Sequence, residues 1–414
     1  MLDGLLARHR KGWTLERGFY TEPALFEREL ERVFRTSWLY AGHESRIPRP
    51  GDFFTWEVAG TPLLVARDAQ GEVHAFLDVC RHRGTRVSGQ PCGNADRFIC
   101  PYHGWTYGLD GRLLAARLMP KDFPKADFGL RRAAVRVAEG LIFVCLAERP
   151  PDLAPALSAI RGHLEPYELG KARICLTREY DVRANWKIVV ENARECYHCV
   201  VAHPELSRLM PHVAIDSPGQ MEQFEREFAA QSAVWEEMGL SADNVPMGER
   251  EYHVMRFAFR KGVVTQTMDG RPKAPLLGRL ERPEAGVVAC SILPGFWLEA
   301  SCDYAFIWRL NPTALDRTHV RVDWLVRGDA REGVDFKPEE VAEFWRVTLE
   351  QDWELCRRNQ EGVTAVGYVP GPFAPGLDRR ATLGEAGPQS FVEWYLGRIG
   401  KDRCEGENAL PRPD

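Results

Sequence analysis

Two histidines and nearby acidic residues in the middle of the chain could bind a metal ion. They lie in the stretch NWKIVVENARECYHCVVAHP. If Lys187 to Tyr197 form a helix, Glu191, Glu195 and His198 lie at i, i+4 and i+7 and share one face. His203 precedes a proline, which disfavours a helical conformation, so its side chain can fold back beside His198. Such a pair is half of a two-histidine, one-carboxylate iron site with positions open for O2, although two histidines five residues apart are more often ordinary polar side chains.

A second cluster places one cysteine and one histidine on each of two segments. The segment CRH, from Cys80 to His82, and the segment CPYH, from Cys100 to His103, are separated by 17 residues. Two such pairs can close a four-ligand metal site. Two chemistries compete for it: a structural zinc, or a [2Fe–2S] cluster in which two thiolates hold one iron and two imidazoles hold the other. The spacing alone does not separate these alternatives.

The residues around this second cluster favour iron and sulfur. Positive charge and close backbone approach suit a cluster whose sulfides accept hydrogen bonds, and two aromatic side chains can shield it from water. These neighbours are Arg81, Arg83, Gly84, Tyr102, Gly104 and Trp105. At this point CRHRG…CPYHGW resembles the Rieske motif of the Rieske non-heme iron oxygenases.

The resemblance implies two metal centres in a catalytic (alpha) subunit. It implies a Rieske-type [2Fe–2S] cluster held by Cys80, His82, Cys100 and His103, and a mononuclear Fe(II) held by His198, His203 and Asp352. Asp352 lies in LEQDWELCRRNQEGV. On a helix its face is distinct from that of Trp345 and Leu349, which can pack elsewhere. Two glutamates beside Asp352 are the competing carboxylates, since a charged helix face is usually only solvated.

Two further residues receive roles from the same resemblance. Glu195 is implied to accept a hydrogen bond from His198 and to reach His103 of a neighbouring chain across a subunit boundary. An acid at this place also fixes the tautomer of the histidine. Many ring-hydroxylating members carry Asp there, so Glu195 is a departure that resembles the subgroup oxidising quaternary amines. Asn185, ahead of the helix, is expected either near the iron or as the helix N-cap.

The resemblance covers most of the chain and is closest to the choline monooxygenase and glycine betaine or stachydrine demethylase subgroup. It implies an oxygenase that uses O2 as co-substrate to hydroxylate a C–H bond, with N-methyl oxidation or demethylation of a quaternary ammonium compound as the first hypothesis. An aromatic ring-hydroxylating dioxygenase alpha subunit is the alternative. A hypothesis from another class is an iron–sulfur electron carrier or a zinc-stabilised binding module.

The resemblance also implies partners. Electrons are expected from NAD(P)H through a separate flavin and ferredoxin-type reductase, because no GxGxxG fingerprint follows a strand in this chain. A homotrimer is expected if Glu195 must reach a neighbour's His103, because head-to-tail contacts that close form rings.

Aromatic side chains in the C-terminal half could form the substrate pocket. A quaternary ammonium cannot donate a hydrogen bond, so aromatic faces must attract it, at about 0.5–2 kcal/mol per contact. The candidates are Phe257, Phe259, Phe296, Trp297, Tyr304 and Trp308. Aromatic residues on strands are more often plain core, and the same pocket could hold an aromatic ring.

Composition narrows the class of protein. The chain has 414 residues, a net charge of −5 and no gathering of lysine or arginine, so nucleic-acid binding is not expected. No stretch of about 18 apolar residues and no secretion signal is found, which predicts a cytoplasmic protein without a membrane segment. Its 11 cysteines are therefore expected as thiols, metal ligands or core residues rather than as disulfides.

The pattern of elements predicts an α+β protein of two main domains. Residues 1–37 are expected to be a helical segment packing on the catalytic domain, residues 38–154 a small all-β Rieske [2Fe–2S] domain, and residues 155–414 a larger catalytic domain of helices over an antiparallel sheet. Strands are expected at 174–182, 253–259, 287–293, 304–310 and 318–326, with a long helix over 338–359. The polar region 211–250 is expected to be a covering loop with short helices.

Overall fold

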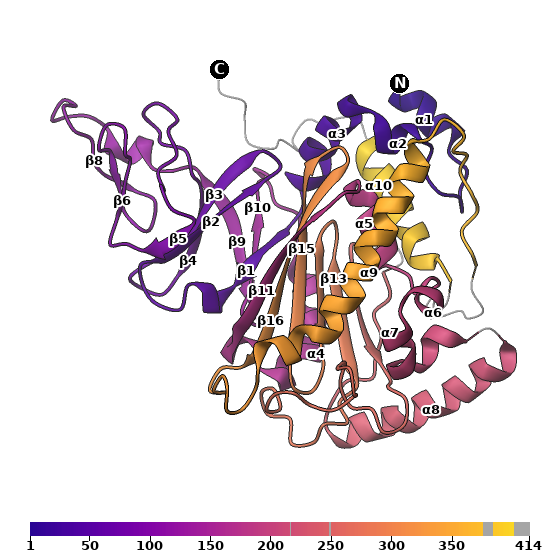
Figure 1. The fold of residues 1–414 in the computed structure, drawn as a ribbon. Coiled ribbons are helices and arrows are strands. Elements are labelled where there is room, and N and C mark those ends of the chain that lie inside the picture. The colour runs from indigo at the N-terminus through magenta and orange to yellow at the C-terminus, as the bar shows by residue number, and fades with distance from the viewer. Residues whose placement is uncertain (216, 248–249, 376–383, 401–414) are drawn as a thin grey trace. The chain divides into compact units, whose positions relative to one another are not determined.

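A computed structural model describes residues 1–215, 217–247, 250–375 and 384–400 (Figure 1). They form two compact units. One contains Met1–Val33 and the described residues from Asp152 onward, and the other contains Phe34–Pro151. The combination of an all-β unit with a unit of helices and antiparallel sheet confirms the α+β prediction. The domain limits at residues 37 and 154 stay a prediction.

The smaller unit is built on a seven-stranded antiparallel sheet. The strand order is β1-β10-β9-β4-β3-β2-β5, with β1 Leu39–His43, β2 Asp52–Val58, β3 Thr61–Arg67, β4 Val73–Leu77, β5 Cys92–Asn94, β9 Arg132–Ala138 and β10 Leu141–Cys145. β9 and β10 are joined by Glu139 and Gly140, both with positive φ (51° and 78°), as a tight hairpin turn requires. Alternating β-branched and aromatic residues explain why this segment forms short strands.

A three-stranded sheet carries the second of the two predicted metal-binding segments, and the first segment follows β4. The sheet contains β6 Phe98–Ile99, β7 Thr106–Tyr107 and β8 Leu113–Ala115. A buried cluster that includes Phe76, Trp105 and Tyr107 packs around Cys80 and Cys100. The two cysteines therefore lie in the apolar core of this unit.

The larger unit is organised around a six-stranded antiparallel sheet. Its order is β11-β16-β15-β14-β13-β12, with β11 Ala172–Val182, β12 Tyr252–Phe257, β13 Val287–Ile292, β14 Phe296–Ala300, β15 Ala305–Ala314 and β16 Arg317–Arg327. All five strands expected from the sequence are present. The strand β14 was not predicted from the sequence. It is short, and it begins only four residues after the end of β13.

The register of this sheet decides which side chains reach the site, because directly paired residues on antiparallel strands point to the same face. One row of paired residues is His253, Ser291, Trp297, Trp308 and Val322. The next row, two residues further along each strand, is Met255, Ala289, Glu299, Phe306 and Trp324. Arg256, the residue after Met255, points to the opposite face, where its guanidinium donates to Tyr167 Oη.

Helices cover this sheet and carry the remaining site residues (Figure 1). The α-helices are α1 Leu2–Arg8, α2 Gly18–Thr21, α3 Pro23–Glu29, α4 Ala154–Leu164, α5 Trp186–Ala193, α6 Cys199–Ala202, α7 Pro204–Leu209, α8 Pro218–Glu237, α9 Pro338–Thr364 and α10 Ala386–Gly400. A π-helical turn, Leu30–Phe34, follows α3, and 3-10 turns lie at Glu44–Arg46, Lys125–Phe128, Glu165–Tyr167, Leu169–Lys171 and Pro211–Ala214.

The helix α9 is the predicted long helix, and it lies over the cavity-facing side of the sheet. Pro338 in its first turn and two acidic residues behind it suit a helix start. The ring of Trp345 stacks on Phe306 of β15, with centroids 4.1 Å apart. This contact places the helix over the second row of the sheet.

The expectation of a covering loop over 211–250 was wrong. The helix α8 occupies 20 of these residues. It is rich in Glu, Gln and Ala, which favour helix, but buries only Phe224 and Trp235, so its apolar period is too weak to see in the sequence.

The N-terminal segment is fixed to the larger unit by a buried carboxylate. Glu29 is fully buried. Its oxygens accept hydrogen bonds from Lys187 Nζ at 2.6 Å, Trp186 Nε1 at 2.7 Å and Tyr395 Oη at 2.5 Å. The carboxylate of Glu29 on α3 therefore connects α5 with α10, two helices that lie about 200 residues apart in the sequence.

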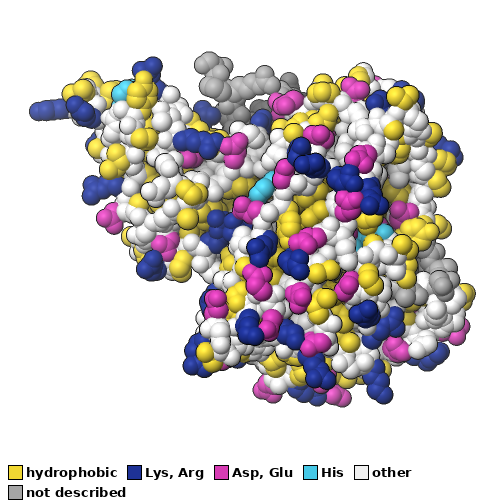
Figure 2. All heavy atoms as spheres, in the orientation of Figure 1, with side chains coloured by type: hydrophobic (Ala, Val, Ile, Leu, Met, Phe, Trp, Pro, Cys, Tyr) yellow, Lys and Arg dark blue, Asp and Glu magenta, His cyan; other side chains and the backbone are white. Residues whose placement is uncertain are grey.

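The surface carries charges of both signs. On the face drawn in Figure 2, basic and acidic side chains are interspersed over both units. Within the described residues, no helix combines the length and apolar character that crossing a membrane requires.

Candidate metal centres and substrate cavity

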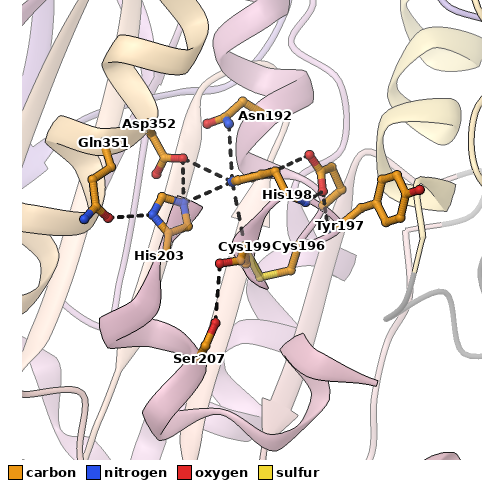
Figure 3. Close-up of a disulfide and its surroundings, with 10 residues drawn as sticks. Asn192, Cys196, Tyr197, His198, Cys199, His203, Ser207, Gln351 and Asp352 are labelled. Carbon is orange, nitrogen blue, oxygen red and sulfur yellow. Dashed lines mark hydrogen bonds and ion pairs between the residues drawn. A yellow bond between two sulfur atoms is a disulfide. The ribbon is translucent and has the colours of Figure 1, made fainter. Parts of the chain in front are cut away.

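Three donor atoms converge in the larger unit (Figure 3). His198 Nε2 lies 3.1 Å from His203 Nε2 and 3.2 Å from Asp352 Oδ1, and His203 Nε2 lies 3.1 Å from the same oxygen. Ligands roughly 2.1 Å from a metal ion and at right angles to one another are about 3.0 Å apart. The triangle therefore fits one face of a metal ion's coordination shell and leaves the opposite face open.

Each histidine is oriented by a hydrogen bond at its other ring nitrogen. His198 Nδ1 donates to Glu195 Oε1 at 2.5 Å, and His203 Nδ1 donates to Gln351 Oε1 at 2.7 Å. With the proton on Nδ1, each Nε2 presents its lone pair to the centre of the triangle. The sequence reading missed Gln351, although its place beside Asp352 on the same helix is the signal that could have found it.

The electrostatics of this triangle favour a positive charge. Burial lowers the pKa of His198, but its hydrogen bonds to Asp352 and Glu195 outweigh this effect and raise the pKa to about 10. Burial raises the pKa of Asp352, yet the bonds from both histidines leave it below its ordinary value. Without a metal, the site holds a proton strongly. A divalent cation suits the same donors, so the residues fit a mononuclear metal ion.

The expected helical face of Glu191, Glu195 and His198 was wrong. The helix α5 ends at Ala193, and the carboxylate of Glu195 accepts the backbone N–H of Tyr197 and of His198, starting a new turn. Glu191 stays on the helix and accepts a hydrogen bond from Tyr20 Oη. A local side-chain-to-backbone bond thus ended the helix earlier than its period indicated.

Asn185 does not join the metal centre. Its Oδ1 accepts the backbone N–H of Lys187 at 3.1 Å, which caps α5, and its Nδ2 donates to the carbonyl of Leu315 at 2.7 Å. Asn185 is therefore the N-cap of α5, which was one of the two roles expected for it.

A disulfide brackets the first histidine, contrary to the expectation of free thiols. Cys196 and Cys199 are bonded to each other on either side of Tyr197 and His198 (Figure 3). The composition of the whole chain could not reveal a bridge between residues only three apart. Of the four cysteines expected in the core, Cys145, Cys290 and Cys302 are buried and free, whereas Cys175 is free and only half-buried.

The two metal-binding segments of the smaller unit are two copies of one loop. Cys80 N donates to Thr85 O at 2.9 Å, and Gly84 N donates to Cys80 O at 2.9 Å. In the second loop, Cys100 N donates to Trp105 O at 2.8 Å and Gly104 N donates to Cys100 O at 3.0 Å. Gly84 and Gly104 have positive φ angles of 80° and 72°, and a Cβ added to either would meet no atom within 4 Å. The backbone conformation, rather than a lack of space, therefore favours glycine at both positions.

These loops bring the four predicted ligands together. Cys80 and Cys100 are both buried, and the thiol of Cys80 lies 3.2 Å from Tyr107 Oη. His82 Nδ1 and His103 Nδ1 are 3.1 Å apart, with both rings at the surface of the unit. Trp105 stacks on His82 with centroids 4.8 Å apart. Two inner sulfurs and two outer imidazoles fit a cluster whose irons have different ligands.

A cavity of about 220 Å³ opens beside the three converging donors. Its walls are the metal-binding segment, the helix-facing rows of the sheet, α9 and the start of α10. Of the predicted aromatic residues, Phe257, Trp297 and Trp308 line it, and Phe259, Phe296 and Tyr304 do not. Phe296 pairs with Ile292 and Arg309, so the alternation of β14 turns it to the other face.

Among the side chains that line the cavity and were not predicted from the sequence, four are important for its chemistry. They are Arg194, Glu299, Phe306 and Trp345. Phe306 and Glu299 are two residues from Trp308 and Trp297, so the strand period was the available signal. Trp345 lies on the same helix face as Asp352, which corrects the expectation that it packs elsewhere.

Comparisons with known proteins agree with this arrangement. Residues 170–401 match the family model of the ring hydroxylating alpha subunit (catalytic domain), and residues 37–130 match that of the Rieske [2Fe-2S] domain. A glycine betaine monooxygenase oxygenase subunit of Chromohalobacter salexigens is 38% identical over 394 residues, covering 94% of this chain and 87% of its own.

Two groups of solved structures share the fold. A quaternary ammonium Rieske monooxygenase, CntA, in complex with L-carnitine has a TM-score of 0.72 at 20% identity, covering 96% of this chain and 99% of its own. A naphthalene 1,2-dioxygenase from Rhodococcus sp. has a TM-score of 0.71 at 20% identity, covering 96% and 97%. The fold alone therefore does not separate the two substrate classes.

The chain belongs to the ring-hydroxylating alpha subunits, the catalytic subunits of the Rieske oxygenases. It is an oxidoreductase of the oxygenase class, with a Rieske [2Fe–2S] cluster, a mononuclear iron and electrons from a separate reductase. The match to a catalytic domain decides against a pure electron carrier or a zinc-stabilised module.

Proposed function

We propose that this oxygenase hydroxylates an N-methyl group of a small betaine and so demethylates it. The observation that carries the proposal is the small aromatic cavity beside His198, His203 and Asp352. Its volume of about 220 Å³ lies below the roughly 300–1,000 Å³ of pockets for drug-sized ligands. A betaine of a few heavy atoms fits this volume.

Aromatic faces suit the cation of such a substrate. Trp297 and Trp308 are stacked with centroids 6.4 Å apart, and Phe306 and Trp345 are stacked at 4.1 Å. A quaternary ammonium on these faces gains cation–π attraction without a hydrogen bond. The glycine betaine monooxygenase subunits among the relatives support the same substrate class.

We assign the metal ligands as the sequence predicted them. His198, His203 and Asp352 are the ligands of the iron, which, when bound, reduces O2 with electrons from the cluster. Glu195 holds the His198 ring and keeps its proton on Nδ1, and Gln351 does the same for His203. In the smaller unit, the ligands of the cluster are Cys80, His82, Cys100 and His103.

The reaction balances as a monooxygenation. One oxygen atom of O2 enters an N-methyl C–H bond, and the other leaves as water with two electrons and two protons. The C–N bond of the resulting hemiaminal then breaks, which gives formaldehyde, the demethylated amine and a proton. The apolar walls of the cavity keep bulk water from the site during this reaction.

The chain is further proposed to act as a cyclic homotrimer. Beside the mononuclear site, Tyr197 and Val201 expose apolar side chains that are 64% and 87% accessible. In the smaller unit, Tyr102 of the second cluster loop and Leu118 are also exposed. Two such patches, one on each unit, suit a head-to-tail contact between copies, which also brings Glu195 of one chain to His103 of the next.

The trimer is tested by its mass in solution. Light scattering should give about three times the 47.0 kDa mass of one chain. A V201D substitution should dissociate the trimer, because it buries an unpaired charge in the contact. The matched control is V366D, at a valine that is 95% exposed elsewhere. An active monomer would exclude this assembly. A cytoplasmic location is also part of the proposal, and cell fractionation tests it.

The substrate class is tested by turnover. With a surrogate reductase and NADH, glycine betaine should stimulate O2 uptake and release one formaldehyde per O2, whereas benzoate should give none. H198A should abolish both signals and keep the absorption and EPR spectrum of the cluster. Ring hydroxylation of benzoate without formaldehyde would instead establish the aromatic alternative.

A further inference from the structure

Two oppositely charged side chains line the cavity, and neither has a charged partner. Among the described residues, Arg194 and Glu299 take part in no ion pair, with each other or with any third group. Burying a charged group without an opposite charge costs free energy. Two such groups in one cavity are therefore rare unless a bound ligand supplies the opposite charges.

Arg194 is held with part of its guanidinium unused. It follows the last residue of α5, donates from one terminal nitrogen to Ser291 Oγ at 3.0 Å, and contacts Met247 Sδ with the other. Its Nε is buried and has no hydrogen-bond partner. Burial lowers the pKa of Arg194 to about 9, and no acid opposes this shift. A planar donor of this kind matches a carboxylate.

The backbone of Arg194 is fixed by close approach of α10. A Cβ added to Gly387 would lie 2.1 Å from the Arg194 carbonyl oxygen. Glycine at this place therefore lets the helix press against the arginine and hold it at the cavity wall.

Glu299 is held by neutral donors only. Gln266 Nε2 donates to its Oε2 at 2.6 Å, and Trp297 Nε1 donates to its Oε1 at 3.1 Å. The orientation of Gln266 is set by Ser301 Oγ, which donates to its Oε1 at 3.2 Å. The residue Glu299 is 8% exposed, and burial raises the pKa of its carboxyl to about 7.

The sheet register places the contact of Arg194 and the side chain of Glu299 in neighbouring rows of one sheet face. Arg194 is bonded to Ser291, which pairs with Trp297, and Glu299 lies two residues further along the same strand. Two residues of an antiparallel strand span about 6.8 Å. The four stacked aromatic side chains lie in these two rows and on α9 above them.

We infer that Arg194 binds the carboxylate of the substrate and that Glu299 faces its quaternary ammonium, so that the cavity selects small zwitterions by the positions of both charges. The inference rests on the proposed function and adds the recognition of the substrate's two ends. A betaine provides an opposite charge for both Arg194 and Glu299, whereas a singly charged molecule of similar shape leaves one of the two without an opposite charge.

The test measures equilibrium binding to the intact oxygenase, with its metals, in the absence of reductase. Three probes of similar shape are titrated by calorimetry: glycine betaine, 3,3-dimethylbutanoate, which lacks the positive charge, and glycine betaine methyl ester, which lacks the negative charge and is larger by one methyl group. The variants are R194Q and E299Q, with R346Q as the control, at a partly exposed arginine of α9 that pairs with Glu350 outside the cavity. Each variant is checked for the cluster spectrum and cooperative unfolding.

R194Q should weaken betaine and 3,3-dimethylbutanoate binding by about 100-fold and leave the ester unchanged. E299Q should weaken the betaine and the ester and leave 3,3-dimethylbutanoate unchanged, and R346Q should change none. Equal weakening of all three probes by R194Q would mean a structural role for the arginine and would overturn the inference.

Two further outcomes keep the inference and the proposed function apart. If R194Q does not fold, the affinities of the wild-type protein for the three probes test the inference. The wild-type protein should bind betaine at least tenfold more tightly than either singly charged probe. Equal binding of the three would overturn the charge selection while formaldehyde release from betaine still stands. A protein that neither binds nor demethylates any betaine contradicts the proposed function itself.

Discussion

At the scale of single residues, His203 depends on Gln351 for its orientation. Replacing Gln351 with Leu removes the only acceptor of its Nδ1 proton among the described residues, so the ring can rotate or change tautomer. We expect the affinity for Fe(II) to fall about 10- to 100-fold, measured by competition with a chelator, with the cluster spectrum unchanged. Q351E, which keeps the acceptor, should retain the metal. Wild-type affinity in Q351L would show that Gln351 does not orient the ligand.

The residues of the site differ in how far the sequence could predict them. Cys80, His82, Cys100 and His103 form a local pattern whose spacing is itself the signal. The meeting of Asp352 with His198 joins residues 154 positions apart, and only the family resemblance suggested it. Arg194 and Glu299 belong to no local sequence pattern. What distinguishes them is that neither has a charged partner among the described residues, and this can be seen only in the folded structure.

At the scale of elements, α3, α5 and α10 are joined through Glu29. Removing this carboxylate in E29A leaves Lys187 buried and uncompensated. Breaking a buried pair from one side costs about 3–5 kcal/mol. The unfolding temperature of the larger unit, measured by calorimetry, should therefore fall well below that of E27A, at an exposed glutamate of the same helix, which should change stability by only about 0.5 kcal/mol. Equal stability of the two variants would contradict this role.

Glu191 on α5 should make stability depend on pH. Burial raises its pKa from 4.5 to about 7, against the lowering effects of Tyr20 and Lys187 and with a further rise from Glu385. Because the folded pKa is the higher one, the stabilising effect is complete below about pH 4.5 and is lost as pH rises through 7.

The variant E191Q isolates this effect, since it stays neutral at every pH. Its unfolding temperature relative to the wild type should rise between pH 5 and pH 8. E27Q should show no such change. A difference that stays constant over this range would place the pKa of Glu191 outside it.

The elements themselves were predictable where their local signals are strong. The predicted strands are short runs rich in β-branched and aromatic residues, and α9 begins at a proline followed by acids, as its sequence indicates. The end of α5 was not predictable from its period, because the Glu195 carboxylate and the Cys196–Cys199 bridge end the helix by contacts beyond the helical repeat. The helix α8 lacked an apolar period because so little of it is buried.

At the scale of the whole molecule, the two metal centres lie in separate compact units and should be lost separately. The complete protein should contain about three irons and two labile sulfides per chain. C100S should keep about one iron and lose the sulfides, whereas H198A should keep about two irons and both sulfides. Elemental analysis with a sulfide assay measures both. Loss of both centres in either variant would show that the two units do not fold independently of each other's metal.

The alternation of the central sheet has a consequence for how substrate range can evolve. Along β12, β14 and β15 the side chains that enter the cavity are every second one, while their neighbours in sequence point to the other face of the sheet. A substitution at Trp297, Glu299, Phe306 or Trp308 therefore alters what the cavity accepts and leaves the opposite core intact. Relatives with one architecture can thus diverge toward ammonium compounds or aromatic rings by a few such exchanges, and a mutant library confined to these positions would explore new substrates at low risk of unfolding.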